Sequence, residues 1–374
     1  NYTRCLLQRW LDGDKAALLA EAGMAVPASR TSNILQSKLA RCVGFAEEGK
    51  DSQACKALTS AGLAANTDAT LSALTAKHPM GEPVRAQLSA APALSGRIRR
   101  DDVLEAVRSF TKGSSPGPSG LRPQHLADAV CGAGQEAALD ALEEVVNLLA
   151  TGQAPRSMAA HIAGANLVAL DKGNGDVRPI AVGEVLRRLT SKCLCNTVRS
   201  DARSHFGSLQ VGVACPLGLE AAVHTVAQYC ESNAGNPDKV MVTIDFSNAF
   251  NSLDRNALLQ ACVRDFPAVA AWACWCYASP SRLLFNGRLV SSAAGVQQGD
   301  NLGPLLFAAA IHPLLAELKA HHGIDITIGY LDDVIVGGNA LAVHAAFVRF
   351  CEASRRMGLH VNFSKCEVVP VAGR

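Results

Sequence analysis

The spacing of apolar and polar residues changes along the chain. Residues 1–100 are rich in alanine and predict helices separated by polar breaks. Apolar residues at helical spacing predict a helix over 135–149, and further helices are expected over 101–110 and 304–320. Because the first hundred residues carry no reactive constellation, we expect them to form a helical packing or docking extension.

Short runs rich in β-branched residues predict strands between these helices. The Gly-containing loop 171–176 lies between two apolar runs, and Asn286-Gly287 is a typical hairpin turn. Strands and hairpins are expected over residues 166–180, 239–245, 283–289 and 324–336. Because helices and strands mix without strict alternation, the predicted fold class is α+β.

The composition narrows the class of protein. Hydrophobic residues make up 49% of the 374 residues, which is enough for a core and excludes a disordered chain. The 35 basic and 33 acidic residues nearly cancel, so any case for nucleic-acid binding must rest on local patches. The most apolar stretch, 303–315, is interrupted by Pro304, His312 and Pro313, so we expect no membrane span.

The cysteines and the chain ends give weaker indications. Thirteen cysteines in a chain of this length do not predict a small disulfide-stapled fold, and their spacing offers no zinc motif. We therefore expect reduced, mostly buried thiols in an intracellular protein of the nucleus or cytoplasm, not a secreted one. The chain begins at Asn1 without Met and stops at Arg374, so we expect a fragment of a longer polyprotein with additional domains.

Three aspartates occur where a carboxylate is costly. Asp245 ends a β-branched strand, and Asp332 and Asp333 have apolar residues on both sides. Neighbouring strands lie about 4.8 Å apart, so carboxylates at their ends can share two divalent ions, for which Mg²⁺ is suited. Such ions activate an attacking hydroxyl and stabilise a leaving phosphate. The alternative is a plain Asp-Asp hairpin turn, with Asp245 as a helix cap.

The segment Tyr330-Leu-Asp-Asp333 resembles the aromatic-x-Asp-Asp signature of reverse transcriptases. Other segments resemble further motifs of that family in the family's order, namely Pro116–Gly120, Asp171–Gly173 with Arg178–Ile180, Ile244–Phe250, Gly295–Phe307 and Gly358–Lys365. The first of these is similar to the extra N-terminal motif of non-LTR (LINE-like) retrotransposon and group II intron enzymes. The resemblance extends from about residue 110 to 367, and the order of the motifs makes chance agreement improbable.

The sequence departs from the family pattern at three places. Asn251 and Ser119 each stand where Asp is common, and Asp300–Gly303 is a variant of the usual Pro-Leu-Ser run. None of the departures removes a carboxylate of the metal site.

The resemblance implies a right-hand polymerase with fingers and palm. It predicts a helical extension over 1–100, fingers with the N-terminal motif loop over 101–238, and a palm over 239–374. The resemblance implies a thumb after the palm, and we expect that thumb to be missing from this chain.

By the same resemblance, Asp245 and Asp332 would ligate two Mg²⁺ ions, for which Mn²⁺ is a substitute, and Asp333 would be the supporting carboxylate. The backbone carbonyl of Phe246 would be a further metal contact. Phe250 would be the steric gate that excludes a 2′-hydroxyl, with a core aromatic as the alternative.

Several polar residues would bind the nucleotide. Lys172 and Arg178 would neutralise the triphosphate, although Lys172 can also be read as a hydrated hairpin charge. Gln298 and Gly299 would line the nucleotide and template pocket, or else form a plain strand-to-helix turn. Lys365 would protonate pyrophosphate, with an ordinary surface lysine as the alternative.

A basic helix is predicted over 184–198. Positive side chains recur on and just beyond it near helical spacing, namely Arg187, Arg188, Lys192, Arg199 and Arg203. Such a stripe suits contact with a phosphate backbone, and a solvated helix face is the alternative.

The predicted function is that of an RNA-directed DNA polymerase, with an RNA template, a DNA primer and dNTPs as partners. An RNA-dependent RNA polymerase is one alternative, but such enzymes usually have Gly before Asp-Asp and lack an aromatic gate, so Tyr330 and Phe250 disfavour it. A decayed or domesticated palm that binds nucleic acid without catalysis is the other alternative.

Overall fold

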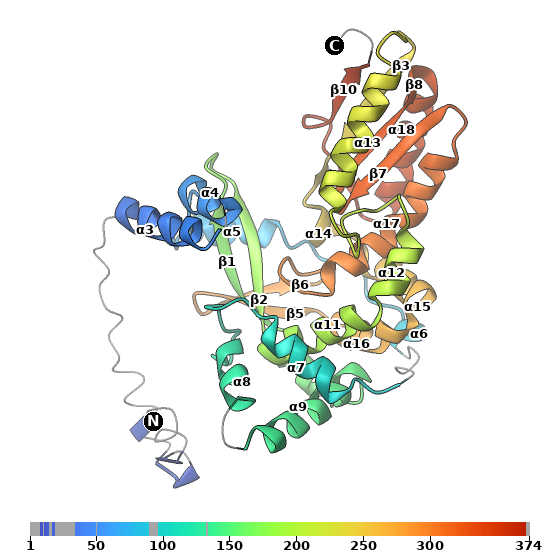
Figure 1. Ribbon diagram of the computed structural model, residues 1–374. Coiled ribbons are helices and arrows are strands. Elements are labelled where there is room, and N and C mark those ends of the chain that lie inside the picture. Colours follow the sequence, from blue (N-terminus) through green and yellow to red (C-terminus); the bar gives the residue numbers. More distant parts are fainter. Residues whose placement is uncertain are drawn as a thin grey trace. The chain divides into compact units, whose positions relative to one another are not determined.

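The computed structural model describes residues 8–9, 11–14, 17–18, 34–49, 51–89, 96–131 and 134–371. It is a mixed helix and sheet protein, as predicted (Figure 1). The helices are α3 (Ile34–Glu47), α4 (Asp51–Thr59), α5 (Asp68–Ala76), α6 (Ala86–Ser89), α7 (Arg100–Arg108), α8 (Pro123–Ala129), α9 (Gln135–Ala150), η1 (Arg156–Met158), α10 (Ala159–Ile162), α11 (Val185–Thr197), α12 (Arg199–Phe206), α13 (Gly218–Ser232), α14 (Ala249–Ser252), α15 (Arg255–Asp265), α16 (Pro267–Tyr277), α17 (Gly303–Ala320) and α18 (Ala340–Arg356). Within the described ranges, no helix is both long and apolar enough to cross a membrane.

The strands form three sheets. They are β1 (Ala165–Asp171), β2 (Val177–Gly183), β3 (Lys239–Ile244), β4 (Phe246–Ser247), β5 (Ser281–Phe285), β6 (Arg288–Ser292), β7 (Ile324–Tyr330), β8 (Asp333–Asn339), β9 (His360–Val361) and β10 (Glu367–Pro370). Their orders are β2-β1-β5-β6, β10-β3-β8-β7 and β4-β9. Each predicted strand and hairpin is confirmed.

The chain divides into two compact units, residues 1–61 and 62–374. In the first unit α3 packs on α4. In the second unit α5 packs on β2 and β6, so residues 62–89, which we expected in a separate extension, belong with the rest of the fold.

The first sheet joins two parts that the sequence separates. β1 pairs with β2 as an antiparallel hairpin and with β5 in parallel, at Ala165↔Leu283. Its strands thus come from the predicted fingers and from the predicted palm. The sheet therefore spans the expected boundary between fingers and palm after residue 238.

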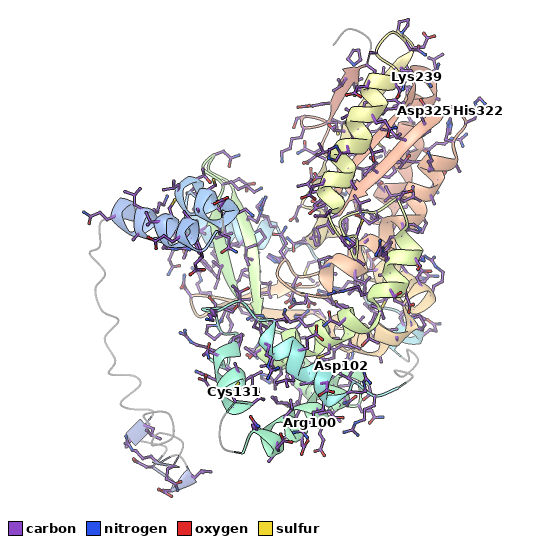
Figure 2. All side chains as sticks on the ribbon, viewed as in Figure 1. Arg100, Asp102, Cys131, Lys239, His322 and Asp325 are labelled. Atoms are coloured by element: carbon purple, nitrogen blue, oxygen red, sulfur yellow. The ribbon has the colours of Figure 1, made fainter. Side chains whose placement is uncertain are left out.

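The second sheet carries the acidic hairpin. In it β3 lies beside β8, with Ile244 opposite Val334. On one face Ile244 and Val336 join the core with helices α17 and α18, and on the other Met241 and Ile335 pack around Tyr229 of α13 (Figure 1). Far from the acidic tip, Lys239 and Asp325 form an ion pair of 2.6 Å between β3 and β7 (Figure 2).

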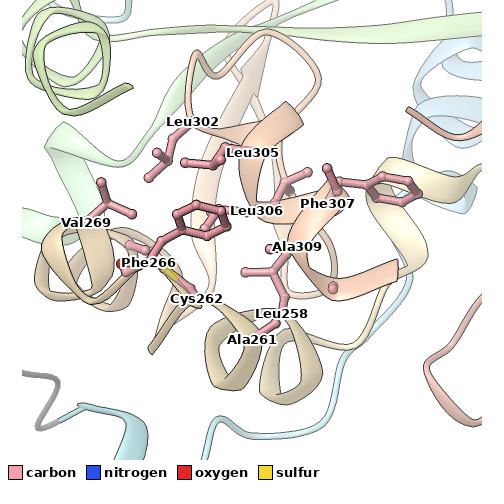
Figure 3. Packing of buried hydrophobic residues seen from close by; sticks show 14 of the residues in the cluster. Leu258, Ala261, Cys262, Phe266, Val269, Leu302, Leu305, Leu306, Phe307 and Ala309 are labelled. Carbon is pink, nitrogen blue, oxygen red and sulfur yellow. Dashed lines mark hydrogen bonds between the residues drawn. The ribbon is translucent and has the colours of Figure 1, made fainter. Parts of the chain in front are cut away.

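The largest core lies where α15, α16 and α17 meet. Figure 3 shows Leu258 and Cys262 of α15 packed with Leu306 and Ala309 of α17. α16 is buried from Val269 to Tyr277, so it has no polar face from which a helical period could be read. This core supports the loop that precedes α17, which contains the Gln-Gly motif.

Of the twelve described cysteines only four are buried, Cys193, Cys262, Cys274 and Cys276, so the expectation of mostly buried thiols is wrong.

Candidate active site

A polar cavity of about 350 Å³ lies beside the end of β3 and the acidic hairpin. Seven of the predicted site residues line it: Lys172, Arg178, Asp245, Phe246, Gln298, Asp332 and Lys365. They come from five of the six recognised motif segments. The fold therefore gathers at one place residues that are up to 193 positions apart (365 − 172).

The carboxylates of this cavity lie close enough to affect one another. Burial raises the pKa of Asp332, and the charges of Asp333 and Asp245 raise it further. Burial and Asp245 likewise raise the pKa of Asp333, while Lys365 opposes the shift. Asp333 itself is exposed and does not line the cavity.

Asp245 has one oxygen without a hydrogen-bond partner. Its Oδ1 is buried, and the nearest cation is Lys365, whose Nζ lies 3.9 Å away. Burial of an unpartnered carboxylate oxygen is costly, so this oxygen fits a ligand for a cation. Among the described residues, however, no group of three or more His, Cys, Asp or Glu side chains is arranged to hold a metal ion.

The backbone around Asp245 is held by the segment after α18. The Asn362 amide donates to the Asp245 carbonyl at 2.8 Å, and Phe246 pairs with Val361. The Phe246 ring is buried, with its centroid 5.8 Å from that of Phe350. Since the side chain lies in the core, only the backbone of Phe246 is placed to serve the cavity.

Two lysines that line the cavity share one carboxylate. Asp176 forms ion pairs of 2.8 Å with both Lys172 and Lys77. Although burial opposes it, these lysines hold the pKa of Asp176 well below its ordinary value. Sequence reasoning missed Lys77, which lies in the alanine-rich region without a motif. Its carbonyl accepts a hydrogen bond of 2.8 Å from Asn248, inside the first aspartate motif.

The Gln-Gly loop is attached to β2, the strand that carries Arg178. The Ala181 amide donates to the Gln298 carbonyl at 2.6 Å. Gly299 has φ +118°, and a Cβ there would lie 2.4 Å from the Ala181 oxygen, so only glycine fits. The Gln298 Oε1 atom is buried without a hydrogen-bond partner, whereas Gly299 itself does not line the cavity.

Phe250 is a packing residue in this structure. Its ring stacks on Phe307 with centroids 4.7 Å apart and planes at 12°. Its carbonyl accepts from the Val296 amide at 2.7 Å, and it does not line the cavity. The role of a steric gate therefore stays a prediction.

The prediction for Arg187 is wrong. Its side chain is only 1% exposed and forms a 2.7 Å ion pair with Asp300. Its Nη1 also donates to the Ala163 carbonyl and to Gln297 Oε1, both at 2.6 Å. Buried and paired in this way, it cannot contact a phosphate backbone. The helical spacing of the basic residues could not show that the carboxylate of Asp300 would cover one of them.

Arg188 and Lys192 both lie against the ring of Phe110. Arg188 Cζ is 5.1 Å and Lys192 Nζ 5.0 Å from the centroid of Phe110. Arg188 donates to the Ser115 carbonyl at 2.8 Å, and Lys192 to the Ser109 hydroxyl at 2.9 Å. Burial lowers the pKa of both groups. They are half-buried, and their contact with nucleic acid stays a prediction.

The remaining departures from the family pattern have local partners. The Ser119 amide and hydroxyl each donate to Glu184 at 2.6 Å, which fixes the N-terminal motif loop to the start of α11. Asn251 is buried, and its Nδ2 donates to Asn248 Oδ1 at 2.9 Å. Neither departure therefore leaves a buried polar side chain without a partner.

A family model described as "Reverse transcriptase (RNA-dependent DNA polymerase)" matches residues 170–372. The chain belongs to the reverse transcriptase family. This match covers more than half of the chain and every cavity-lining residue except Lys77. The predicted enzyme class, an RNA-directed DNA polymerase and hence a nucleotidyltransferase, is that of the family.

The chain also resembles individual proteins. It is 26% identical over 285 residues to the "Retrotransposable element SLACS 132 kDa protein" of Trypanosoma brucei gambiense, a match that covers 74% of this chain and 23% of that protein. The chain thus spans about a quarter of the length of this relative. The motif-based resemblance to a reverse transcriptase domain of a non-LTR retrotransposon is supported by both comparisons.

Two solved structures of telomerase from Candida tropicalis are similar to part of the chain. The apo enzyme truncated from its C-terminal domain has a TM-score of 0.43 and 13% identity, and covers 56% of this chain and 50% of that one. The apo enzyme has a TM-score of 0.42 and 12% identity, and covers 56% and 44%.

Proposed function

We propose that this domain adds deoxynucleotides to a primer 3′-hydroxyl on an RNA template, by two-metal-ion catalysis, as part of a non-LTR retrotransposon protein. One observation carries the proposal: the cavity brings together carboxylates and cations from five separate motif segments of a reverse transcriptase. The DNA primer and dNTPs are the remaining substrates, and further domains of the same polyprotein are expected partners.

Asp245 and Asp332 would hold the metal ions, with the Phe246 carbonyl as a further ligand and Asp333 in support. The unpartnered Oδ1 of Asp245 and the raised pKa values of Asp332 and Asp333 describe a group of carboxylates that lacks positive charge. When bound, Mg²⁺ would activate the primer hydroxyl and stabilise the leaving phosphate. Mn²⁺ would be a substitute.

Lys172 and Arg178 would bind the triphosphate. In this structure Lys172 is engaged with Asp176, so an incoming polyphosphate would replace that carboxylate as its partner. Lys77 shares Asp176 and lines the same cavity, which makes it a third candidate cation. These three positive groups lining one cavity suit the charge of a triphosphate, because fixed cations stabilise charge that develops on transferring phosphates.

The other predicted residues surround this centre. Gln298 and Gly299 would shape the nucleotide and template pocket, and Phe250, whose carbonyl accepts from the Val296 amide, would act as the steric gate. Lys365, 3.9 Å from Asp245, would deliver a proton to pyrophosphate. Arg188 and Lys192 would contact the nucleic-acid backbone from α11.

The proposal is tested by primer extension on an RNA template with Mg²⁺, comparing dNTPs with rNTPs, beside the variant Asp332→Asn. The matched control is Asp325→Asn, which removes a carboxylate at the far end of β7, where it pairs with Lys239. We expect extension with dNTPs that is lost in Asp332→Asn and kept in Asp325→Asn. Extension that survives Asp332→Asn would overturn the metal assignment. Primer–template binding without extension would identify a non-catalytic palm, and a preference for rNTPs an RNA polymerase.

A further inference from the structure

The turn that carries Asp332 has an unusual backbone. Tyr330 pairs with Asp333, so Leu331 and Asp332 form a two-residue hairpin loop between β7 and β8. Leu331 has φ +58°, in the left-handed region that disfavours a residue with a branched side chain. A positive φ at the first loop position is typical of a type II′ turn, which favours glycine there. Something outside the hairpin must therefore stabilise Leu331 in this conformation.

The side chain of Gln210 binds both backbone groups of Leu331. Its Oε1 accepts from the Leu331 amide at 2.8 Å, and its Nε2 donates to the Leu331 carbonyl at 3.2 Å. The same Oε1 accepts from the Gly212 amide at 3.1 Å. Gln210 is fully buried, so these hydrogen bonds do not compete with solvent.

The backbone on both sides of Gln210 is also fixed to the hairpin. The Val211 amide donates to the Gly329 carbonyl at 2.8 Å, and the Gly329 amide donates to the Leu209 carbonyl at 2.7 Å. The segment 209–211 therefore lies alongside β7 as a short parallel bridge. This bridge places the Gln210 side chain beside Leu331 whatever the turn itself prefers.

Two glycines leave the space that this contact needs. A Cβ at Gly329 would lie 3.0 Å from Gln210 Nε2 and 2.8 Å from a methyl group of Leu315. A Cβ at Gly212 would lie 2.8 Å from the Leu331 nitrogen. Both would force the glutamine and the turn apart, so the close approach depends on glycine at both positions.

We propose that Gln210 is a positioning residue that holds Leu331 in the left-handed conformation and thereby sets where the hairpin presents the Asp332 carboxylate. The inference rests on the proposed function for the catalytic role of Asp332, but the clamp itself is a property of Gln210 and Leu331. Without the glutamine, the turn would relax toward conformations in which Asp332 is displaced from Asp245. Displacement of a carboxylate at a reacting centre lowers kcat more than it weakens substrate binding.

The central variant is Gln210→Met, which keeps the length of the side chain but removes both hydrogen bonds to Leu331 together with the one to the Gly212 amide. We expect kcat for primer extension to fall about five- to thirty-fold, which is the population change that follows from losing the support of one left-handed residue. KM for dNTP should stay within about twofold, because the residues that line the nucleotide cavity are untouched. The matched control is Thr327→Val, a buried substitution on the same strand β7 whose hydroxyl has no partner to lose. It should leave kcat unchanged.

A second substitution separates positioning from folding. Leu331→Gly introduces a residue that adopts a positive φ without steric cost. In the double variant Gln210→Met/Leu331→Gly we expect kcat to recover at least about threefold relative to Gln210→Met. A loss of activity in Gln210→Met that comes with a collapsed thermal transition and no recovery in the double variant would mean a purely structural role, and would overturn the proposal. A kcat within twofold of the parent would overturn it too.

Hydrogen exchange tests the clamp without any activity. In Gln210→Met the Leu331 amide should exchange at least about tenfold faster, whereas the Val211 amide, bonded to the Gly329 carbonyl, should change much less. If the parent protein fails to extend a primer, the proposed function falls and the exchange rate of Leu331 alone decides the clamp. An unchanged Leu331 exchange rate would overturn it in either case.

Discussion

Arg187 and Asp300 form a buried ion pair, with Nη2 and Oδ2 separated by 2.7 Å and both side chains almost fully excluded from solvent. The Tyr277 hydroxyl donates to the same Asp300 oxygen at 2.5 Å. Although burial disfavours its charge, Asp300 raises the pKa of Arg187 above its ordinary value. The pair explains why one member of the predicted basic stripe is buried. It ties the Gln-Gly loop to α11.

Removal of one partner from this pair should destabilise the protein strongly. Arg187→Met leaves a buried carboxylate and Asp300→Leu a buried guanidinium, and each should lower the free energy of unfolding by about 3–5 kcal/mol. The double variant Arg187→Met/Asp300→Leu should recover roughly half of that loss or more, because neither charge then stays unpaired. Urea denaturation of the four proteins gives the values.

Arg188→Met is the control for that series. Among the described residues, Arg188 forms no ion pair with a buried carboxylate. It is half-buried against Phe110, so its loss should cost about 1 kcal/mol or less. A cost for Arg187→Met as small as that of Arg188→Met would contradict the importance of the buried pair.

Gly299 should be intolerant of a side chain. Gly299→Ala combines a positive φ with a Cβ only 2.4 Å from the Ala181 oxygen, so the loop must leave β2. The control is Gly173→Ala, because Gly173 has φ +78° but open space around its Cβ. We expect Gly173→Ala to cost about 1–2 kcal/mol from backbone strain alone, and Gly299→Ala at least about 1 kcal/mol more. Thermal unfolding compares them, and equal losses would mean that the loop moves freely from β2.

The parts of the fold that the sequence predicts well are those with local signals. The hairpin over β5 and β6 follows from Asn286-Gly287, and the acidic hairpin from alternating apolar residues around Asp332. Asp245 and Asp332 also lie within short motifs, so the sequence names them directly. The structure adds that both line one cavity.

The parts that the sequence missed depend on contacts between distant segments. Lys77 is 99 positions from its partner Asp176, and no local pattern marks it. The side chain of Gln210 binds a turn 121 positions away. The spacing of basic residues on α11 shows which of them share a helix face, but it does not show that Arg187 is buried in an ion pair with Asp300. Tertiary pairing of this kind leaves no period in the sequence.

Lys77 should contribute to nucleotide binding in spite of its place outside the motifs. Lys77→Met removes one of the four positive side chains that line the cavity, so we expect KM for dNTP to rise about tenfold with a smaller change in kcat. Asp176→Asn should act in the opposite direction and lower KM, since it frees Lys77 and Lys172 from their shared partner. Steady-state kinetics with varied dNTP measures both.

The control for Lys77 is Lys239→Met. Lys239 also forms an ion pair with an aspartate, Asp325, but lies at the far end of the acidic sheet. Its loss should leave KM for dNTP unchanged. An equal effect of both substitutions would mean that Lys77 acts only through general charge or stability.

His78 should make the stability of the fold depend on pH. It is 8% exposed, and its Nδ1 lies 2.7 Å from the Leu74 carbonyl. Burial lowers its pKa from the ordinary 6.5, the hydrogen bond to Leu74 opposes this, and the charge of Arg255 lowers it further.

As pH falls below about 6.5, the unfolded state therefore binds a proton before the folded state does, and the free energy of unfolding decreases by up to about 1.4 kcal/mol per pH unit. Urea denaturation between pH 5 and pH 8 should show a shallower slope for His78→Gln than for the parent, whereas His224→Gln, on the exposed side of α13, should keep the parent's slope. Parallel curves for His78→Gln and the parent would assign the acid sensitivity to other groups.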